Sequence, residues 1–204
     1  MKPKRLKHLI NHVVLLLDAS SSMDHLTDQV IKVVDAQVAY LARQSTAMNQ
    51  ETRVSIYAFG SKVECLIYDM DVLRLPSIKM LYNADGMTAL IDGAVQAIKD
   101  LSLVPQLYSD HAFLIYTWTD GQENHSHNTR STLSKMISAL ADNWTLGVFV
   151  PSKADKAQAE ANGFPASNIE VWDTTAKGVE LVSDKIKTTT QNFMQARSKG
   201  ERGL

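Results

Sequence analysis

The chain has 204 residues, enough for one sizeable domain, and its hydrophobic and charged fractions of 45% and 21% are those of a globular protein rather than a disordered or fibrous one. Its 21 Lys and Arg against 22 Asp and Glu give a formal net charge of −1, which argues against a nucleic-acid binder that works through bulk positive charge. No apolar run approaches the ~20 residues of a membrane-spanning helix, and the single cysteine is typical of a reducing compartment, so we expect a cytoplasmic protein with no membrane partner.

The predicted elements alternate between apolar runs and amphipathic stretches. After a basic lead-in (1–9), near-continuous apolar runs occur at 13–17, 112–118 and 146–150, as in strands covered on both faces. Apolar side chains recur every three or four residues over 26–41, 90–101, 133–140 and 179–193, which predicts helices packed by one face. We expect one α/β domain over residues 10–194 and a flexible basic tail over 195–204.

One segment departs from this alternation. Arg53–Phe59 and Lys62–Tyr68 are strand-like runs joined by Gly60-Ser61, and a glycine that opens such a turn favours a tight antiparallel hairpin. The predicted order is β-α-β-β-α-β-α-β-α-β-α, with a mostly parallel sheet and the second run of the hairpin as an antiparallel edge strand.

Three loops with oxygen-bearing side chains follow from this layout. They are D-x-S-x-S from Asp18 after the first strand, G-x-T ending at Thr88 before the helix at 90–101, and T-D-G around Asp120 after the strand at 112–118. Ligands bind beyond the carboxyl ends of strands in open parallel sheets, so these loops should meet. Asp18, Ser20, Ser22, Thr88 and Asp120 offer five hard oxygen donors, which suit Mg²⁺ or Mn²⁺. Three donors are neutral hydroxyls, which leaves the ion enough positive charge to bind a further carboxylate.

The three motifs in this order resemble the metal-ion-dependent adhesion site (MIDAS) of von Willebrand factor A (vWA) domains. The resemblance covers roughly residues 10 to 193 and implies a Rossmann-like three-layer sandwich, with a six-stranded sheet of order 3-2-1-4-5-6 and one antiparallel edge strand. It also implies that the two serines and the threonine ligate the metal directly or in a state-dependent way, and that the aspartates act largely through water. Ser21 stands where glycine is common in the family, which removes no ligand. The stretch TDGQEN and the single module resemble small stand-alone vWA proteins of bacteria and phages.

The expected function is that of a non-enzymatic module that binds an Asp or Glu of a partner protein through Mg²⁺. Met23, Met87, Glu123 and His125 are expected on the rim that selects the partner. In a first alternative, a second copy of the chain supplies the carboxylate from Glu201, which makes a homo-oligomer. In a second, the chain is a metal-dependent hydrolase with Glu123 or His125 as base, although Ser20 stands where aspartyl phosphatases carry their second acid and no phosphate-binding glycine motif is present.

Simpler interpretations remain open for each motif. D-x-S-x-S could be the N-cap of the helix at 26–41, and Asp120-Gly121 could be a plain turn. Glu123, His125 and His127 could also hold a second metal such as Zn²⁺ or Ni²⁺.

Overall fold

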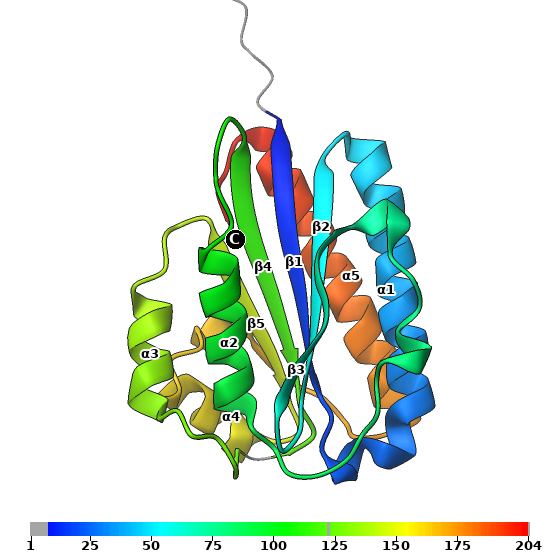
Figure 1. The fold of residues 1–204 in the computed structure, drawn as a ribbon, viewed down its shortest axis with the longest axis vertical. Coiled ribbons are helices and arrows are strands. Elements are labelled where there is room, and N and C mark those ends of the chain that lie inside the picture. The colour runs from blue at the N-terminus through cyan, green and yellow to red at the C-terminus, as the bar shows by residue number, and fades with distance from the viewer. Residues whose placement is uncertain (1–7, 122, 204) are drawn as a thin grey trace, which may run out of the picture.

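Six strands form the central sheet of the computed structural model, which describes residues 8–121 and 123–203 (Figure 1). The strands are β1 (Leu9–Asp18), β2 (Glu51–Phe59), β3 (Val63–Asp71), β4 (Asp110–Trp118), β5 (Trp144–Val150) and β6 (Ile169–Val171). Their order is β3-β2-β1-β4-β5-β6, and β3 pairs antiparallel with β2 while every other neighbouring pair is parallel. The topology predicted from the sequence is confirmed.

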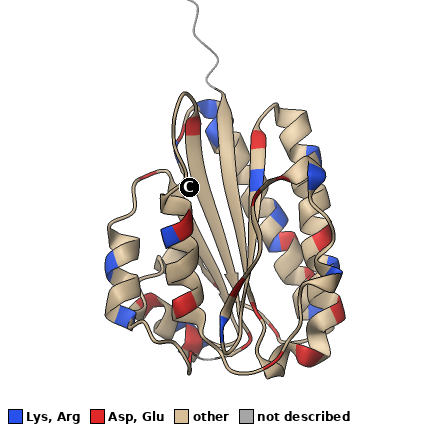
Figure 2. Ribbon diagram, viewed as in Figure 1, with Lys and Arg blue, Asp and Glu red and all other residues tan. Residues whose placement is uncertain are grey.

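Five helices cover the two faces of the sheet. The helices α1 (Thr27–Met48) and α5 (Ala176–Lys199) lie on one face, and α2 (Leu90–Ser102), α3 (Arg130–Ser138) and α4 (Lys153–Ala161) lie on the other (Figure 1). Alternate residues of β1 serve both layers, since Leu15 packs in the α1–α5 core and Leu16 in the α2–α4 core. Figure 2 shows Lys, Arg, Asp and Glu on the helices, loops and strand ends, with the middle of the sheet free of them.

The β2–β3 hairpin differs in detail from the prediction. Its connection has three residues, Gly60 to Lys62, rather than the two predicted, and Phe59 pairs with Val63 across it. The Gly60 N–H donates to the Lys62 carbonyl, and a Cβ at Gly60 would come within 2.7 Å of the Asp85 carbonyl oxygen. The close approach of the Asp85 segment therefore favours glycine at position 60, a contact that the sequence of the hairpin alone does not show.

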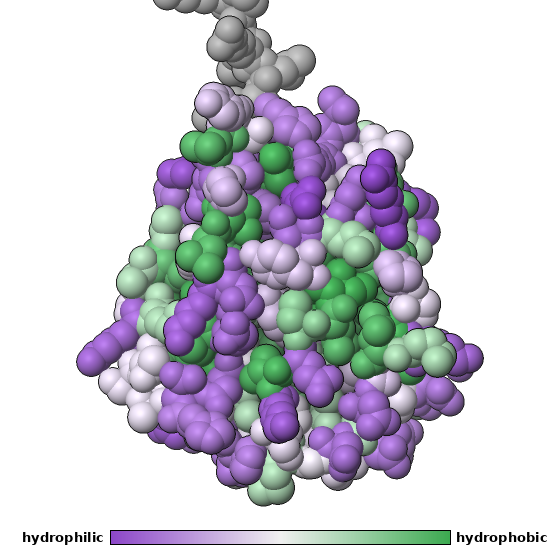
Figure 3. All heavy atoms as spheres, viewed as in Figure 1, coloured by the Kyte–Doolittle hydropathy of each residue, from purple (hydrophilic) through white to green (hydrophobic). Residues whose placement is uncertain are grey.

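The edge strand and the segment after it carry exposed apolar side chains. Met70 on β3 is 38% exposed, and Leu73 and Met80 in the following segment are 62% and 89% exposed. This segment contains two short 3₁₀ helices, η2 (Val72–Arg74) and η3 (Ile78–Met80), and Figure 3 shows apolar atoms gathered in this region. No helix in the described parts of the chain has both the length and the apolar character needed to cross a bilayer.

The carboxyl-terminal segment corrects the expectation of a flexible tail from residue 195. The helix α5 continues to Lys199 and ends at Gly200, whose φ of 91° is left-handed. Arg197 is only 2% exposed and donates to Asp110 at the start of β4, which holds the last turn of α5 on the sheet. Residues 1–7 of the expected basic lead-in lie outside the described residues.

Strand order positions the candidate site. The order in which successive strands are added to the sheet reverses at β1, which has β2 on one side and β4 on the other. Because β1 and β4 are parallel neighbours, their carboxyl ends lie side by side, and the loops that leave them begin at Ala19 and Thr119. This is the switch point at which open α/β sheets bind ligands.

Candidate metal centre

The first loop leaves β1 and passes into a short 3₁₀ helix, η1 (Ser21–Leu26), before α1 begins. Ser20 occupies the N-cap position of η1 in an extended conformation, yet its side chain makes no capping hydrogen bond. The interpretation of D-x-S-x-S as an ordinary helix cap is therefore wrong. The oxygen atoms of this motif face one another instead.

A continuous chain of hydrogen bonds joins four of the five predicted donors. The Asp18 carboxylate accepts from the Ser20 backbone N–H at 2.9 Å, the Ser20 and Ser22 hydroxyl oxygens are 3.0 Å apart, and the Ser22 hydroxyl donates to Asp120 at 2.9 Å. Because the one hydroxyl hydrogen of Ser22 goes to Asp120, Ser20 is the donor to Ser22. Residues 98 positions apart in the sequence thus share one cluster of oxygen atoms.

Burial decreases across this cluster from the sheet to the surface. Asp18 and Ser20 are 0% and 3% exposed, Asp120 is half-buried and Ser22 is exposed. Burial raises the pKa of Asp18, while hydrogen bonds from Ser20 and Thr119 act in the opposite direction. In the described parts of the chain, Asp18 has hydroxyl and N–H partners but no Lys or Arg partner. A buried carboxylate without a counter-charge, beside several hydroxyl oxygens, fits a divalent cation.

Thr88, the fifth predicted donor, lies buried against the Asp120 loop. It is 4% exposed, and a Cβ added at Gly121 would lie 3.8 Å from its hydroxyl oxygen. Gly121 itself donates its N–H to the Thr119 hydroxyl, which in turn donates to Asp18 at 2.5 Å. Asp120-Gly121 therefore belongs to a network that reaches Asp18 and is more than a plain turn.

Backbone contacts also fix the first loop against the second. Ser21 donates its N–H to the Gly86 carbonyl at 3.0 Å and accepts the Gly86 N–H on its hydroxyl at 2.9 Å. Asp85 donates its N–H to the Ala19 carbonyl at 2.7 Å. Gly86 has a φ of 94°, and a Cβ there would come within 2.3 Å of the Ser61 hydroxyl oxygen, so this position requires glycine. The serine at position 21 thus contributes a contact that glycine could not make.

Two of the four predicted rim residues are not where the sequence interpretation placed them. Met23 is 1% exposed and packs in the core, because η1 turns it inward. The Glu123 carboxylate points at the start of α2, where it accepts the Ile91 N–H at 2.8 Å. Met87 is 45% exposed and His125 is exposed, so these two are accessible from solvent.

The same contacts weigh against a second metal at Glu123, His125 and His127. Glu123 also accepts from the Ser126 hydroxyl and from the N–H groups of His125 and Ser126, which uses both of its oxygens. His127 lies beside Asp92, with 3.2 Å between Nδ1 and the carboxylate. Within the described residues, no three His, Cys, Asp or Glu side chains come together as a metal group. The candidate centre contains only two carboxylates, Asp18 and Asp120, because its other three donors are hydroxyls.

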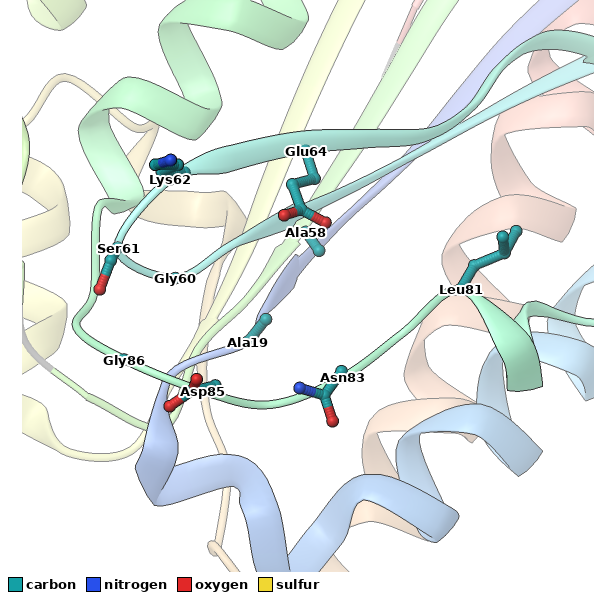
Figure 4. A pocket seen from close by; sticks show the side chains of 10 residues that line it. All are labelled: Ala19, Ala58, Gly60, Ser61, Lys62, Glu64, Leu81, Asn83, Asp85 and Gly86. Atoms are coloured by element: carbon teal, nitrogen blue, oxygen red, sulfur yellow. The ribbon is translucent and has the colours of Figure 1, made fainter.

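A polar pocket of about 260 Å³ adjoins the first loop. Figure 4 shows its lining, with Glu64 from β3 on one side and Asn83 and Asp85 from the opposite segment on the other. Ala19 and Gly86, which belong to the metal loops, line it as well. The surface beside the first loop is therefore concave and polar.

Sequence reasoning missed residues that support the centre without being donors. The Tyr82 hydroxyl donates to the Asp18 carbonyl, and Thr119 bonds to the Asp18 carboxylate. Asn124 contacts the backbone of Thr88 through its side chain. The sequence did contain one signal for such residues. Ala89, the N-cap of α2, has no side chain that could cap the helix, so the first N–H groups of α2 must find acceptors elsewhere in the chain.

Comparison with solved structures identifies proteins of the same architecture. The chain aligns with a von Willebrand factor type A protein from Catenulispora acidiphila at 15% identity and a TM-score of 0.61, covering 88% of this chain and 42% of that one. It aligns with the pilus adhesin SpaC from Lactobacillus rhamnosus GG in its open conformation at 11% identity and a TM-score of 0.70, covering 91% and 30%. It also aligns with proximal thread matrix protein 1 from the mussel byssus, solved with a zinc-occupied MIDAS motif, at 12% identity and a TM-score of 0.60, covering 90% and 46%.

These alignments show a shared fold, and this chain spans less than half the length of each of the three proteins. No protein-family model matches the sequence. No curated protein matches it either.

Proposed function

We propose that this chain, which has the vWA fold, is a non-enzymatic binding module that holds Mg²⁺ or Mn²⁺ at Asp18, Ser20, Ser22, Thr88 and Asp120 and binds an acidic side chain of a partner protein there. The single observation that carries the proposal is the hydrogen-bonded cluster from Asp18 through Ser20 and Ser22 to Asp120. When bound, the ion supplies positive charge for an incoming carboxylate. The comparison with the mussel matrix protein, whose MIDAS motif holds zinc, supports the same proposal.

The five proposed donors differ in how deeply they lie below the surface, which suggests different roles toward the ion and the partner. Asp18, Ser20 and Thr88 are buried, so they form the fixed floor of the site. Ser22 and Asp120 lie nearer the solvent, on the side from which a partner would approach. Met87 and His125, both exposed, and the pocket beside Glu64 and Asp85 offer contacts for residues that flank the partner's acid.

Catalysis receives less support than binding. Glu123, a base candidate in the hydrolase alternative, accepts four hydrogen bonds from the chain itself. The self-assembly alternative has the exposure of Glu201 in its favour, because this side chain follows α5 at the end of the molecule opposite the metal loops and could reach only another copy.

Calorimetric titration with Mg²⁺ and Mn²⁺ tests the site assignment. Asp18→Asn and Ser20→Ala should abolish metal binding, since each removes a buried donor or the charge that faces the ion. Asp24→Ala removes an exposed acid of the same loop from outside the donor set and should bind metal like the wild type. Metal affinity unchanged in both Asp18→Asn and Ser20→Ala would rule out the assignment.

Water-proton relaxation of the Mn²⁺-loaded protein tests the position left for a partner. A Glu-containing tripeptide in excess should lower the relaxation enhancement because its carboxylate displaces water from the ion, whereas the same tripeptide with Gln should not. Equal effects of the two peptides would argue against carboxylate recognition.

A further inference from the structure

The second and third metal loops are joined by a reciprocal set of hydrogen bonds. We call this set the clasp and define it by Glu123, Asn124 and Ser126 from the loop after β4, by Thr88 from the loop before α2 and by Asp92 from the first turn of α2. The loop contributes side-chain acceptors for the α2 backbone, and α2 contributes a side-chain acceptor for the loop backbone. The clasp therefore couples the loop that carries Asp120 to the loop that carries Thr88.

Asn124 holds Thr88 from both sides of its backbone. The Thr88 N–H donates to the Asn124 side-chain oxygen at 2.9 Å, and the Asn124 N–H donates to the Thr88 carbonyl at 3.1 Å. Hydrogen bonds to both the N–H and the carbonyl of Thr88 restrain its backbone at two points, whereas a single bond would let the backbone rotate about that contact. The hydroxyl of Thr88 is thereby held beside Gly121, next to Asp120.

Glu123 and Ser126 stabilise α2, the helix that begins two residues after Thr88. The α2 N-cap is Ala89, which makes no side-chain cap. Ile91 donates its N–H to Glu123 at 2.8 Å, and Asp92 donates its N–H to the Ser126 hydroxyl at 2.9 Å. A carboxylate at a helix N-terminus also interacts favourably with the helix dipole.

Asp92 completes the clasp from the side of the helix. Its carboxylate accepts the N–H groups of His127 and Asn128, both at 2.8 Å, and the Asn128 side-chain amide at 2.7 Å. Burial alone would raise the pKa of Asp92, but these hydrogen bonds outweigh it and hold the pKa below its ordinary value. The loop that carries Asn124 is therefore anchored on both sides of that residue.

We propose that Asn124 is a positioning residue of the metal centre, which sets the affinity for Mg²⁺ or Mn²⁺ by holding both backbone polar groups of Thr88. The inference rests on the proposed function, because it assigns Asn124 a role toward the same ion. Residues that orient metal ligands from outside the ligand set typically change metal affinity by about 10- to 100-fold when they are removed.

Calorimetric Mn²⁺ titrations of matched variants test this role. Asn124→Ala removes the acceptor for the Thr88 N–H and should weaken Mn²⁺ binding by about tenfold or more. Asn124→Asp keeps an oxygen at that place and should recover most of the affinity. Ser152→Ala removes the N-cap of α4, a residue that is not a member of the clasp, and should lose stability while binding Mn²⁺ like the wild type.

A double-variant comparison separates positioning from general damage to the fold. If Asn124 acts through Thr88, Asn124→Ala should weaken Mn²⁺ binding much less in a Thr88→Ala background than in the wild type. An undiminished loss in that background, or wild-type affinity in Asn124→Ala, would overturn the inference. Where Thr88→Ala binds too weakly to measure, the difference between Asn124→Ala and Asn124→Asp decides. If the wild type bound no Mn²⁺ at all, the proposed function itself would fail.

Discussion

Two buried histidines lie at the amino end of the strands, opposite the metal loops. His12 on β1 is 1% exposed and His111 on β4 is 7% exposed, with 3.0 Å between His12 Nε2 and His111 Nδ1. The other ring nitrogen of His12 bonds to Asp69 at 2.9 Å, and Arg53 donates to the same carboxylate. Burial disfavours the charged form of His111 and, together with the neighbouring His12, lowers its pKa below the ordinary value, against a smaller opposing effect of the Leu107 carbonyl and Glu51.

This lowered pKa predicts a loss of stability in mild acid. The unfolded chain takes up a proton at His111 near pH 6.5, whereas the folded protein does so only at lower pH, so the stabilisation is complete above about pH 6.5 and declines as the pH falls. The contribution to the slope is at most about 1.4 kcal/mol per pH unit, the value for one proton. Urea unfolding between pH 7.5 and 5 should show this decline, and His111→Asn should flatten it. His125→Asn, which removes an exposed histidine, is the control, and equal slopes in all three proteins would contradict the prediction.

The end of α5 shows how a tertiary contact extends an element. Arg197 donates to the Asp110 side chain at 2.8 Å and to its carbonyl at 2.6 Å, and it bonds to the Glu201 carbonyl at 3.3 Å. Gln50 adds a second contact by donating to the Met194 carbonyl at 2.8 Å. The last turn of α5 is therefore held by buried polar contacts with β4 and with the residue before β2.

Removal of the Arg197 side chain should loosen this end of the helix. Arg197→Ala removes the ion pair between Arg197 and Asp110, whose side chains are 1% and 16% exposed, and the loss of one member of a buried ion pair typically costs about 3–5 kcal/mol. Hydrogen exchange should become faster for residues 195–199, and the denaturation midpoint should fall. Lys199→Ala, one half-turn further on and exposed, should change stability by less than about 0.5 kcal/mol. Equal effects of the two substitutions would contradict this account.

The spacing of apolar residues along the chain was sufficient to predict most helices and strands but not where they end. The apolar runs at 13–17 and 112–118 lie inside β1 and β4, because strands buried on both faces need continuous apolar sequence. The spacing over 179–193 likewise lies inside α5. The last turn of α5 contains Arg197 and Lys199, which read as a solvated tail, and only the contact with Asp110 reveals that Arg197 is buried.

The placement of the metal loops follows from the whole sheet rather than from any one loop. Asp18 ends β1 and Asp120 follows β4, and these strands are adjacent although about a hundred residues separate them. The encounter of the Asp18 and Asp120 motifs was predictable, since the carboxyl ends of parallel neighbours share one edge. The inward turn of Met23 and the use of Glu123 as a cap for α2 were not, because both depend on packing between loops.

Metal binding at this edge should stabilise the entire fold. An ion that binds only the native state raises the free energy of unfolding by about 2.7 kcal/mol at 100 times its dissociation constant. Thermal unfolding of the wild type should therefore shift upward with Mg²⁺ and return with EDTA, and Asp18→Asn should show no shift. An equal shift in Asp18→Asn would mean that the ion acts elsewhere on the molecule.

Both ends of the described chain lie far from the metal loops. His8 pairs with the start of β4 through its carbonyl, and Gly203 lies against Asp142 just before β5, so both sit at the amino edge of the parallel strands (Figure 1). A surface linker, fluorophore or affinity tag attached at residue 8 or 203 would thus leave the opposite edge facing the bulk solution. The molecule can therefore be immobilised through either position for biosensor measurements without obstructing the oxygen cluster.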